Sequence, residues 1–249
     1  MKALHKRFVR ASILAALFLV LFVGPAGAQT IWTKLNNTNA ANSNISGTQG
    51  RIPLGTSGGD TGGAQKPTVI KDGSVYRMWY GGNGGTPAYY RIYCATSSDG
   101  LTWTKMTNAV PANSDTNSTL GRVPLGTANT GDDGYTAHPS VIKDGAVYRM
   151  WYSGNDGAIS RIYSATSTDA VVWNKVTNAI PPNSDAISTN CIPLGTTGKG
   201  DASQVGYPVV INDGSVYRMW YAGYDGSSIW RIYSATSTDA AVWLSLIHI

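Results

Sequence analysis

The acidic residues of this 249-residue chain are 14 aspartates, and no glutamate is present. Those that could do chemistry lie in loops ahead of a recurring proline: Asp60, the pair Asp132 and Asp133, and Asp201. Loop carboxylates can cap turns in solvent, hydrogen-bond the hydroxyls of a sugar, or bind Ca²⁺. Catalysis would require a paired acid and base, and no such pair is visible around these residues. The sequence leaves the first three alternatives open and assigns no catalytic residue.

The residue immediately before that proline changes between copies of an otherwise constant phrase. It is Lys66 in KPTVIKDGSVYRMWY, His138 in HPSVIKDGAVYRMWY and Tyr207 in YPVVINDGSVYRMWY. We predict that these three side chains contact a ligand, because they vary at the mouth of a constant scaffold. Four aromatic residues of the second and third repeats could stack on sugar rings or pack in the propeller core: Tyr135, Tyr207, Tyr224 and Trp230.

Few residues are available for a transition-metal centre. Of three histidines, His138 is the one that lies in neither terminal segment, and the cysteines number two, Cys94 and Cys191. We therefore expect no zinc or copper cluster and no cofactor, with Ca²⁺ at the loop acids as the one ion considered. Whether the two cysteines pair is left open, because the repeats place serine or glycine at the equivalent positions.

The N-terminal segment, residues 1–28, has the features of a secretory signal peptide. A basic start precedes the apolar run ASILAALFLVLFVG, and a small-residue cleavage site, AGA, follows. Removal of this segment leaves 15 of the 19 Lys and Arg residues against 14 Asp, so the net charge falls close to zero. We expect a secreted or cell-surface protein with no membrane span after cleavage and no nucleic-acid partner.

The C-terminal segment, residues 244–249, reads LSLIHI and interrupts a repeat directly after Trp243. It matches the translation of an adapter used in sequencing libraries, and we set it apart as a scar. We accordingly expect further repeats or domains beyond Trp243.

The region from 29 to 243 contains repeated units about 70 residues apart. The arginine of RIY recurs at Arg91, Arg161 and Arg231, and a tryptophan closes each unit. Apolar residues alternate with period 2, and Asp-Gly pairs separate the apolar runs, so each unit predicts four short antiparallel strands. The expected blades cover about 67–106, 139–176 and 208–243, and an additional outer strand covers 31–35.

Repeated four-stranded units predict an all-β chain of β-propeller type, with about three blades present. A single blade cannot bury both of its faces, so each copy must pack against the next. The arginines of the constant phrase, Arg77, Arg149 and Arg218, are expected to stack on neighbouring aromatic rings.

The phrase HPSVIKDGAVYRMWYSG, with RIYSATSTDA and a closing tryptophan, resembles the blades of five-bladed glycoside hydrolases of the arabinanase, levansucrase and invertase type. That resemblance implies a site on the propeller axis, where an Asp before the inner proline and a Glu from another blade do the chemistry. Here Lys66, His138 and Tyr207 occupy the Asp position. SSDGLTW also resembles the Asp-box turn of sialidase propellers, which implies that Asp99 accepts turn amides and that Trp103 packs between blades.

Two functions follow from these observations. The first is a secreted carbohydrate-active propeller, similar to glycoside hydrolases, that acts on or binds poly- or oligosaccharides. The alternative is a non-catalytic glycan-binding or structural repeat propeller of a larger surface protein. The chain contains no glutamate, and in none of the three repeats does an Asp precede the proline of the inner strand. The sequence therefore leaves enzymatic activity undecided.

Overall fold

A computed structural model of the chain describes residues 52, 54, 60–84, 89–106, 123–126, 131–176, 192–195 and 198–245. Every regular element in this part of the chain is a β-strand, as predicted. The predicted signal segment 1–28, the outer strand 31–35 and Cys191 lie outside the described residues. Across the described ranges, no helix has the length and apolar character that a membrane crossing requires.

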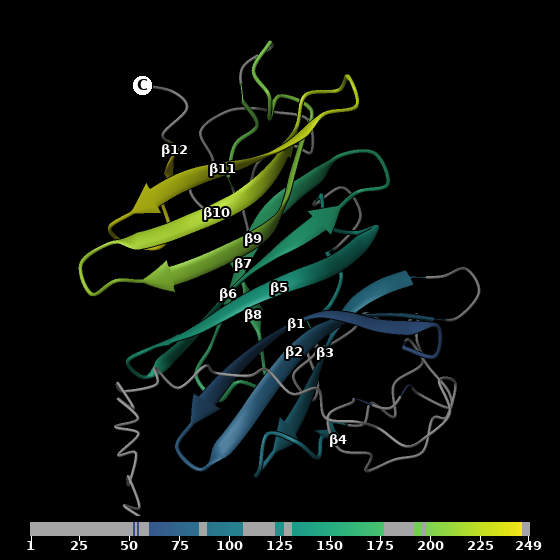
Figure 1. The fold of residues 1–249 in the computed structure, drawn as a ribbon, viewed down its shortest axis with the longest axis vertical. Coiled ribbons are helices and arrows are strands. Elements are labelled where there is room, and N and C mark those ends of the chain that lie inside the picture. Colours follow the sequence, from purple (N-terminus) through teal and green to yellow (C-terminus); the bar gives the residue numbers. More distant parts are fainter. Residues whose placement is uncertain are drawn as a thin grey trace, which may run out of the picture. The chain divides into compact units, whose positions relative to one another are not determined.

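In the described ranges, twelve strands form three antiparallel sheets of four (Figure 1). Sheet 1 contains β1 (Gly63–Asp72), β2 (Val75–Gly84), β3 (Tyr89–Ser97) and β4 (Thr104–Lys105). Sheet 2 contains β5 (Tyr135–Asp144), β6 (Val147–Asn155), β7 (Ser160–Ser167) and β8 (Asn174–Lys175). Sheet 3 contains β9 (Gln204–Asn212), β10 (Tyr217–Tyr224), β11 (Trp230–Ser237) and β12 (Leu244–Ser245). Each predicted repeat therefore forms one four-stranded propeller blade.

The Asp-Gly turns join the first two strands of each sheet. Gly73 between β1 and β2 and Gly145 between β5 and β6 both have φ of 60°, and Gly214 has φ of 97°. Glycine adopts this left-handed backbone region without the steric penalty that a Cβ atom imposes. Turn chemistry thus sets the register in which Asp72 opposes Val75 and the alternating residues of both strands pair.

The innermost strands begin earlier than the sequence predicts. They start at Gly63, Tyr135 and Gln204, about four residues before the expected blade starts at 67, 139 and 208. A register shift between Gln65 and Thr68 carries the ladder past the proline, which has no amide hydrogen to donate. The same bulge recurs in the other two sheets, and its consequences for the site are described below.

Hydrophobic cores lie between consecutive sheets. In sheets 2 and 3, we call the face that packs against the preceding sheet the leading face, and we use the same name for the equivalent face of sheet 1. The opposite face of each sheet is its trailing face. Trp79 of sheet 1 contacts Trp173 of sheet 2 edge-to-face with ring centroids 5.7 Å apart, and Trp151 contacts Trp243 of sheet 3 at the same separation. Trp103 is buried on the leading face of sheet 1. The prediction that each repeat covers the next is confirmed.

The turn after the third strand of each sheet is held by an aspartate. Asp99 Oδ1 accepts hydrogen bonds of 2.8 Å from the backbone amides of both Leu101 and Thr102. These amides, with Thr102 contributing most, lower the pKa of Asp99 to about 2. The same bonds recur at Asp169 and Asp239, as the resemblance to Asp-box turns implies.

Aspartates at the hairpin turns link neighbouring sheets. Asp144 of sheet 2 accepts a hydrogen bond of 2.5 Å from the hydroxyl of Tyr217 in sheet 3, and Arg149 Nε lies 2.8 Å from the same carboxylate. Arg218 pairs in the same way with Asp213. The arginines of the constant phrase therefore bind the aspartate five residues earlier, and Arg149 additionally lies 6.0 Å from the ring centroid of Tyr217.

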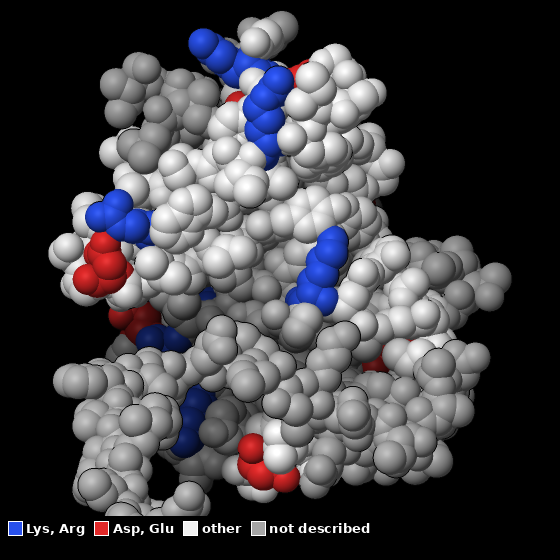
Figure 2. Space-filling view, in the orientation of Figure 1, with Lys and Arg blue, Asp and Glu red and all other residues white. Residues whose placement is uncertain are grey.

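Charged side chains make up 13% of the chain. In the face seen in Figure 2, uncharged side chains cover most of the described surface, and Lys, Arg and Asp are scattered rather than gathered in a single patch.

Candidate functional site

The residue before each inner-strand proline has an unusual backbone conformation. Lys66, His138 and Tyr207 have φ of 52°, 54° and 58°, in the left-handed region that residues with a Cβ atom rarely adopt. Each is the extra residue of the β-bulge, and a residue in such a conformation costs roughly 1–3 kcal/mol. The bulge turns the three side chains toward one another, although they are about 70 residues apart in sequence.

These three residues form a compact group that we call the bulge cluster. Lys66 Nζ lies 3.0 Å from His138 Nε2 and 3.9 Å from the ring centroid of Tyr207. The imidazole of His138 stacks on the ring of Tyr207, with centroids 4.2 Å apart and an interplanar angle of 19°. One residue from each sheet thus contributes to a single site on the innermost strands β1, β5 and β9.

The protonation state of the bulge cluster follows from its hydrogen bonds. The ammonium group of Lys66 can only donate, so His138 Nε2 accepts and the ring is neutral with its proton on Nδ1. Burial, together with the nearby charge of Lys66, lowers the pKa of His138 to about 4. Partial burial also lowers the pKa of Lys66. With His138 neutral, Lys66 is the basic side chain of the cluster that can carry a positive charge.

Ser153 of β6 connects the cluster to the scaffold. His138 Nδ1 donates to Ser153 Oγ over 3.2 Å, and the backbone amide of Tyr207 donates to the same oxygen over 2.9 Å. Sequence reasoning did not identify Ser153. A signal was available, because Gly81 and Ala222 stand at the equivalent positions of the other repeats and neither has a hydroxyl group.

Aromatic rings continue from the cluster along sheet 3. Trp230 meets Tyr207 edge-to-face at 5.9 Å and stacks on Tyr224 at 5.0 Å. Tyr207 and Trp230 are exposed, so their rings can contact a solute. We call Tyr207, Tyr224 and Trp230 the aromatic platform. Tyr135 lies partly buried on β5, three residues before His138, and its hydroxyl is 2.8 Å from Ser160 Oγ.

The loop acids occupy a different environment from the bulge cluster. Asp60, Asp132 and Asp201 are buried, and each accepts a hydrogen bond of 2.8–3.0 Å from a tyrosine hydroxyl of its own sheet. Those tyrosines are Tyr80, Tyr152 and Tyr221. Burial is the main cause that raises the pKa of Tyr80 and Tyr152, and the adjacent carboxylate adds to it.

Two of these buried acids also hold a lysine. Lys105 Nζ lies 2.5 Å from Asp60 Oδ2, and Lys175 Nζ lies 2.6 Å from Asp132 Oδ2. We call each set of carboxylate, tyrosine and lysine a lock. Such buried, paired carboxylates tie the loop to the sheet and are not presented to a ligand. Asp133, beside Asp132, is partly buried.

The described residues contain no group of three or more metal-ligating side chains. The loop acids are separated into different sheets, and each is bound to its own tyrosine. Ca²⁺ requires six to eight oxygen ligands, and the described neighbourhood of these carboxylates does not assemble such a set. Cys94 is a buried free thiol, and burial raises its pKa to about 12.

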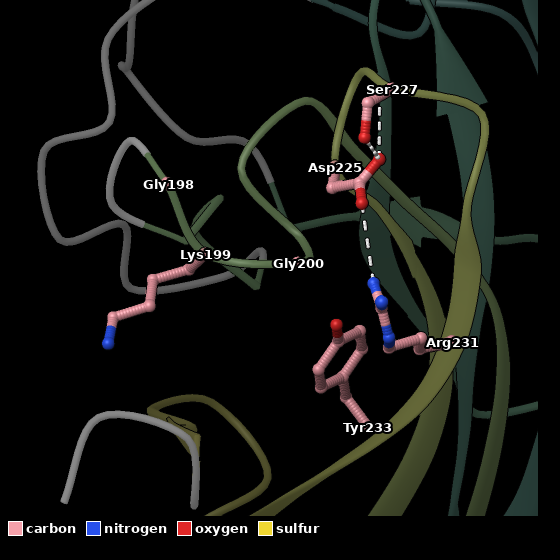
Figure 3. A pocket seen from close by; sticks show the side chains of 7 residues that line it. All are labelled: Gly198, Lys199, Gly200, Asp225, Ser227, Arg231 and Tyr233. Atoms are coloured by element: carbon pink, nitrogen blue, oxygen red, sulfur yellow. Dashed lines mark hydrogen bonds and ion pairs between the residues drawn. The ribbon is translucent and has the colours of Figure 1, made fainter.

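A hollow beside β11 is lined by Arg231, Asp225, Tyr233 and residues 198–200 (Figure 3). Arg231 Nη1 lies 3.3 Å from Asp225 Oδ2, and Lys199 extends away from this pair. Because Arg231 and Asp225 bind each other, Lys199 is left as the one further charged side chain that lines the hollow. The bulge cluster with the aromatic platform is the stronger candidate site.

No known protein-family model matches the sequence. Over 58 residues, or 23% of this chain, it is 52% identical to Rv1502, an uncharacterized protein of Mycobacterium tuberculosis strain H37Rv, and those residues are 18% of that protein. The same values hold for MT1551 of strain CDC 1551.

Solved structures with the same fold are glycoside hydrolase propellers. One is Zg3597, a family 117 glycoside hydrolase of the marine bacterium Zobellia galactanivorans, with a TM-score of 0.55 and 15% identity over 74% of this chain and 55% of that one. Another, from Parabacteroides distasonis, carries a provisional glycoside hydrolase assignment; its TM-score is 0.52, with 18% identity over 87% of this chain and 60% of that one. The chain thus has the propeller fold that its repeats predict, and it spans somewhat more than half of these structures.

Proposed function

We propose that this protein is a carbohydrate-binding propeller whose described site is the bulge cluster together with the aromatic platform. The observation that carries the proposal is the combination of exposed rings, Tyr207 and Trp230, with polar groups of Lys66 and His138 beside them. Sugar rings present apolar C–H faces to aromatic rings and hydroxyl groups to hydrogen-bonding side chains, and both kinds of partner meet here.

The proposal is binding rather than hydrolysis by the described residues. Glycoside hydrolysis by the common mechanism requires two carboxyl groups that face the glycosidic bond. Within the described residues the bulge cluster contains no carboxylate, and the buried aspartates Asp60, Asp132 and Asp201 are bound to tyrosines. The positive φ of the three cluster residues supports a functional role, because strained backbone is commonly retained at sites of function.

We further propose that the protein acts at the cell surface or outside the cell. The basis is the N-terminal segment, whose basic start, apolar run and AGA site resemble a secretory signal. Poly- and oligosaccharides on surfaces would then be the accessible ligands.

The test is a screen of the full chain on an array of poly- and oligosaccharides, followed by calorimetric titration with each glycan that binds. Trp230→Ala removes a ring of the platform, and we expect it to weaken binding about tenfold, which corresponds to about 1.4 kcal/mol. Trp220→Ala is the matched control, because it also removes an exposed tryptophan from sheet 3. Trp220 lies on β10 opposite Val209 of β9 and is not part of the aromatic platform. If no glycan binds, or if both variants weaken binding equally, the proposed site is wrong.

A further inference from the structure

Lys66 provides the polar group of the bulge cluster that remains available to a ligand. Both ring nitrogens of His138 are engaged within the protein, because Nε2 accepts from Lys66 and Nδ1 donates to Ser153. A lysine ammonium group has three N–H donors and no acceptor, so donors remain after the bond to His138. Lys66 is exposed, and its Nζ lies over the ring of Tyr207, which is 43% exposed. A solute bound beside Tyr207 is therefore within reach of this ammonium group.

Within the described part of the chain, no carboxylate neutralises Lys66. Three other lysines each bind an aspartate, and these are Lys105, Lys143 and Lys175. Lys66 instead lies against the rings of His138 and Tyr207. Burial lowers the pKa of Lys66, whereas a carboxylate close by would raise it. Among the described residues, the bulge cluster therefore presents a basic group that no acid compensates.

Aromatic rings, rather than acids, continue around the cluster. Tyr90 of β3 meets Tyr135 of β5 edge-to-face, with ring centroids 6.1 Å apart. Burial is the main cause that raises the pKa of Tyr207, and Tyr135 and Tyr90 are near enough to add to the effect. A charge beside such rings is screened less than a charge in open water. The position of Lys66 therefore strengthens its attraction to an anion.

We propose that the bulge cluster binds an anionic group of the glycan, so that the ligand of the carbohydrate site is an acidic sugar with a carboxylate or a sulfate ester. This inference rests on the proposed function, because it names the class of glycan that the same site takes. Lys66 supplies the positive charge, and Tyr207 and Trp230 supply the rings against which the sugar packs. Uronates and sulfated sugars share this chemistry, and the experiment below separates them.

An anionic acceptor gains more at Lys66 than a neutral sugar hydroxyl does. A hydrogen bond with an ionised partner is shorter than one between neutral groups and roughly twice as strong. In the free site, partial burial of Lys66 disfavours its charged form. An anion bound beside Lys66 offsets that penalty, because an opposite charge favours the protonated amine. The site therefore distinguishes acidic sugars from neutral sugars of the same shape.

The hollow beside β11 is the competing place for an anion. Lys199 is exposed and lines this hollow, where Arg231 is already bound by Asp225. Lys199 extends away from that pair, so the two cations do not converge on one point (Figure 3). None of the three rings of the aromatic platform lines the hollow. The bulge cluster is favoured because it combines a basic group with exposed rings.

An array on which each acidic oligosaccharide stands beside its neutral counterpart tests the inference. Uronate-containing oligosaccharides are paired with their carboxyl-reduced forms, and sulfated oligosaccharides are paired with their desulfated forms. The full chain is applied, and calorimetry then gives the dissociation constants for both members of each pair that binds. We expect the acidic member to bind about tenfold more tightly in at least one kind of pair. The kind of pair identifies the anion as a carboxylate or a sulfate.

Lys66→Met removes the charge and keeps most of the length of the side chain. We expect it to weaken binding of the acidic member about tenfold and to change binding of the neutral member less than about twofold. Lys199→Met is the matched control, because it removes the charge of another exposed lysine and should leave both affinities unchanged. Near-ultraviolet circular dichroism of the tyrosine and tryptophan rings checks that both variants are folded.

Salt provides an independent measurement of the charge. Raising the ionic strength from about 0.01 M to about 1 M shortens the Debye length from about 30 Å to about 3 Å. The affinity of the parent chain for the acidic member should fall over this range, and the affinity of Lys66→Met should fall much less.

The outcomes separate this inference from the proposed function. Neutral members that bind as tightly as their acidic partners would overturn the inference and leave the carbohydrate site standing. An acid preference that survives Lys66→Met, or that Lys199→Met abolishes, would place the anion elsewhere and overturn the assignment to the bulge cluster. If no member of any pair binds, the proposed function itself is wrong and the inference fails with it.

Discussion

Lys175 Nζ lies 2.6 Å from Asp132 Oδ2 inside sheet 2, whereas no ion pair with a lysine is formed by the equivalent aspartate of sheet 3, Asp201, within the described residues. The residue type at one shared register explains the difference. Lys105 pairs with Ala95 and Lys175 with Ala165, whereas the residue paired with Ala235 is Ser245, which belongs to the terminal segment set apart above as a scar. Asp201 is fully buried, and its Oδ1 has no hydrogen-bond partner in the described structure. The lock is therefore complete in two sheets and incomplete in the third.

Removal of the lysine from a complete lock should destabilise the protein strongly. In Lys175→Met, the carboxylate of Asp132 keeps the hydroxyl of Tyr152 but loses its cation. Breaking a buried ion pair from one side costs about 3–5 kcal/mol, because the remaining buried charge loses its counter-ion. We expect a loss of that size in the free energy of unfolding, measured with urea. The double variant Lys175→Met with Asp132→Asn should recover part of it, and a double variant as unstable as the single one would contradict the role of charge.

Completion of the third lock should stabilise the protein. Ser245→Lys places an ammonium group at the position equivalent to that of Lys175 in sheet 2. From there it can donate a hydrogen bond to the carboxylate of Asp201, whose Oδ1 has no partner in the described structure. A hydrogen bond to a charged group contributes roughly 1.5–3 kcal/mol, and we expect a gain toward the lower end because β12 is short. Ser245→Met is the control, since it adds a comparable chain without charge. Equal effects of the two substitutions on the urea midpoint would show that packing, not the ion pair, is responsible.

The strands and their grouping into sheets follow from local sequence signals. Period-2 alternation in VYRMWY and the Asp-Gly turns are properties of neighbouring residues, so they predict four strands per repeat correctly. The bulges were not predicted, because the conformation of Lys66 depends on the proline after it and on pairing with β2. Local rules place the residue before proline in extended backbone, whereas the structure has φ of 52°.

The loop acids show where sequence reasoning reaches its limit. A segment rich in Gly, Thr and Asn has the composition of a solvated loop. Acids that cap turns in solvent were accordingly one of the alternatives left open by the sequence. Asp60 is instead buried, because Tyr80 and Lys105, 20 and 45 residues away in sequence, meet it. The joint recurrence of the three residues in the second repeat was the available signal. The pre-proline residues could be identified as candidates because variation within a constant phrase needs no knowledge of long-range pairing.

The histidine of the bulge cluster should remain neutral to unusually low pH. Its pKa of about 4 lies below the ordinary value of 6.5, because burial disfavours the cation and Lys66 repels it. The unfolded chain therefore binds a proton that the folded chain does not bind between these pH values. The contribution of neutral His138 to the stability of the folded chain is complete above about pH 6.5 and decreases as the pH falls toward 4.

NMR titration of the His138 ring protons measures this pKa, and His138→Gln identifies the resonance among the three histidines. In Lys66→Met we expect the pKa of His138 to rise while remaining below 6.5, since burial, the larger cause, persists. A pKa near 6.5 in the parent chain would show that the ring is not held between Lys66 and Tyr207 as the structure has it.

Ser153 should position the bulge cluster rather than bind the ligand itself. Ser153→Ala leaves the amide of Tyr207 and the Nδ1 proton of His138 without their acceptor. We expect a loss of about 1 kcal/mol in stability, a shift in the His138 ring resonances and weaker glycan binding. Ser140→Ala is the matched control, because Ser140 Oγ likewise accepts one amide of sheet 3, from Val210 over 2.9 Å. The control should lose similar stability yet leave the His138 resonances and glycan affinity unchanged; if both variants weaken binding alike, the effect is one of general stability and Ser153 has no positioning role.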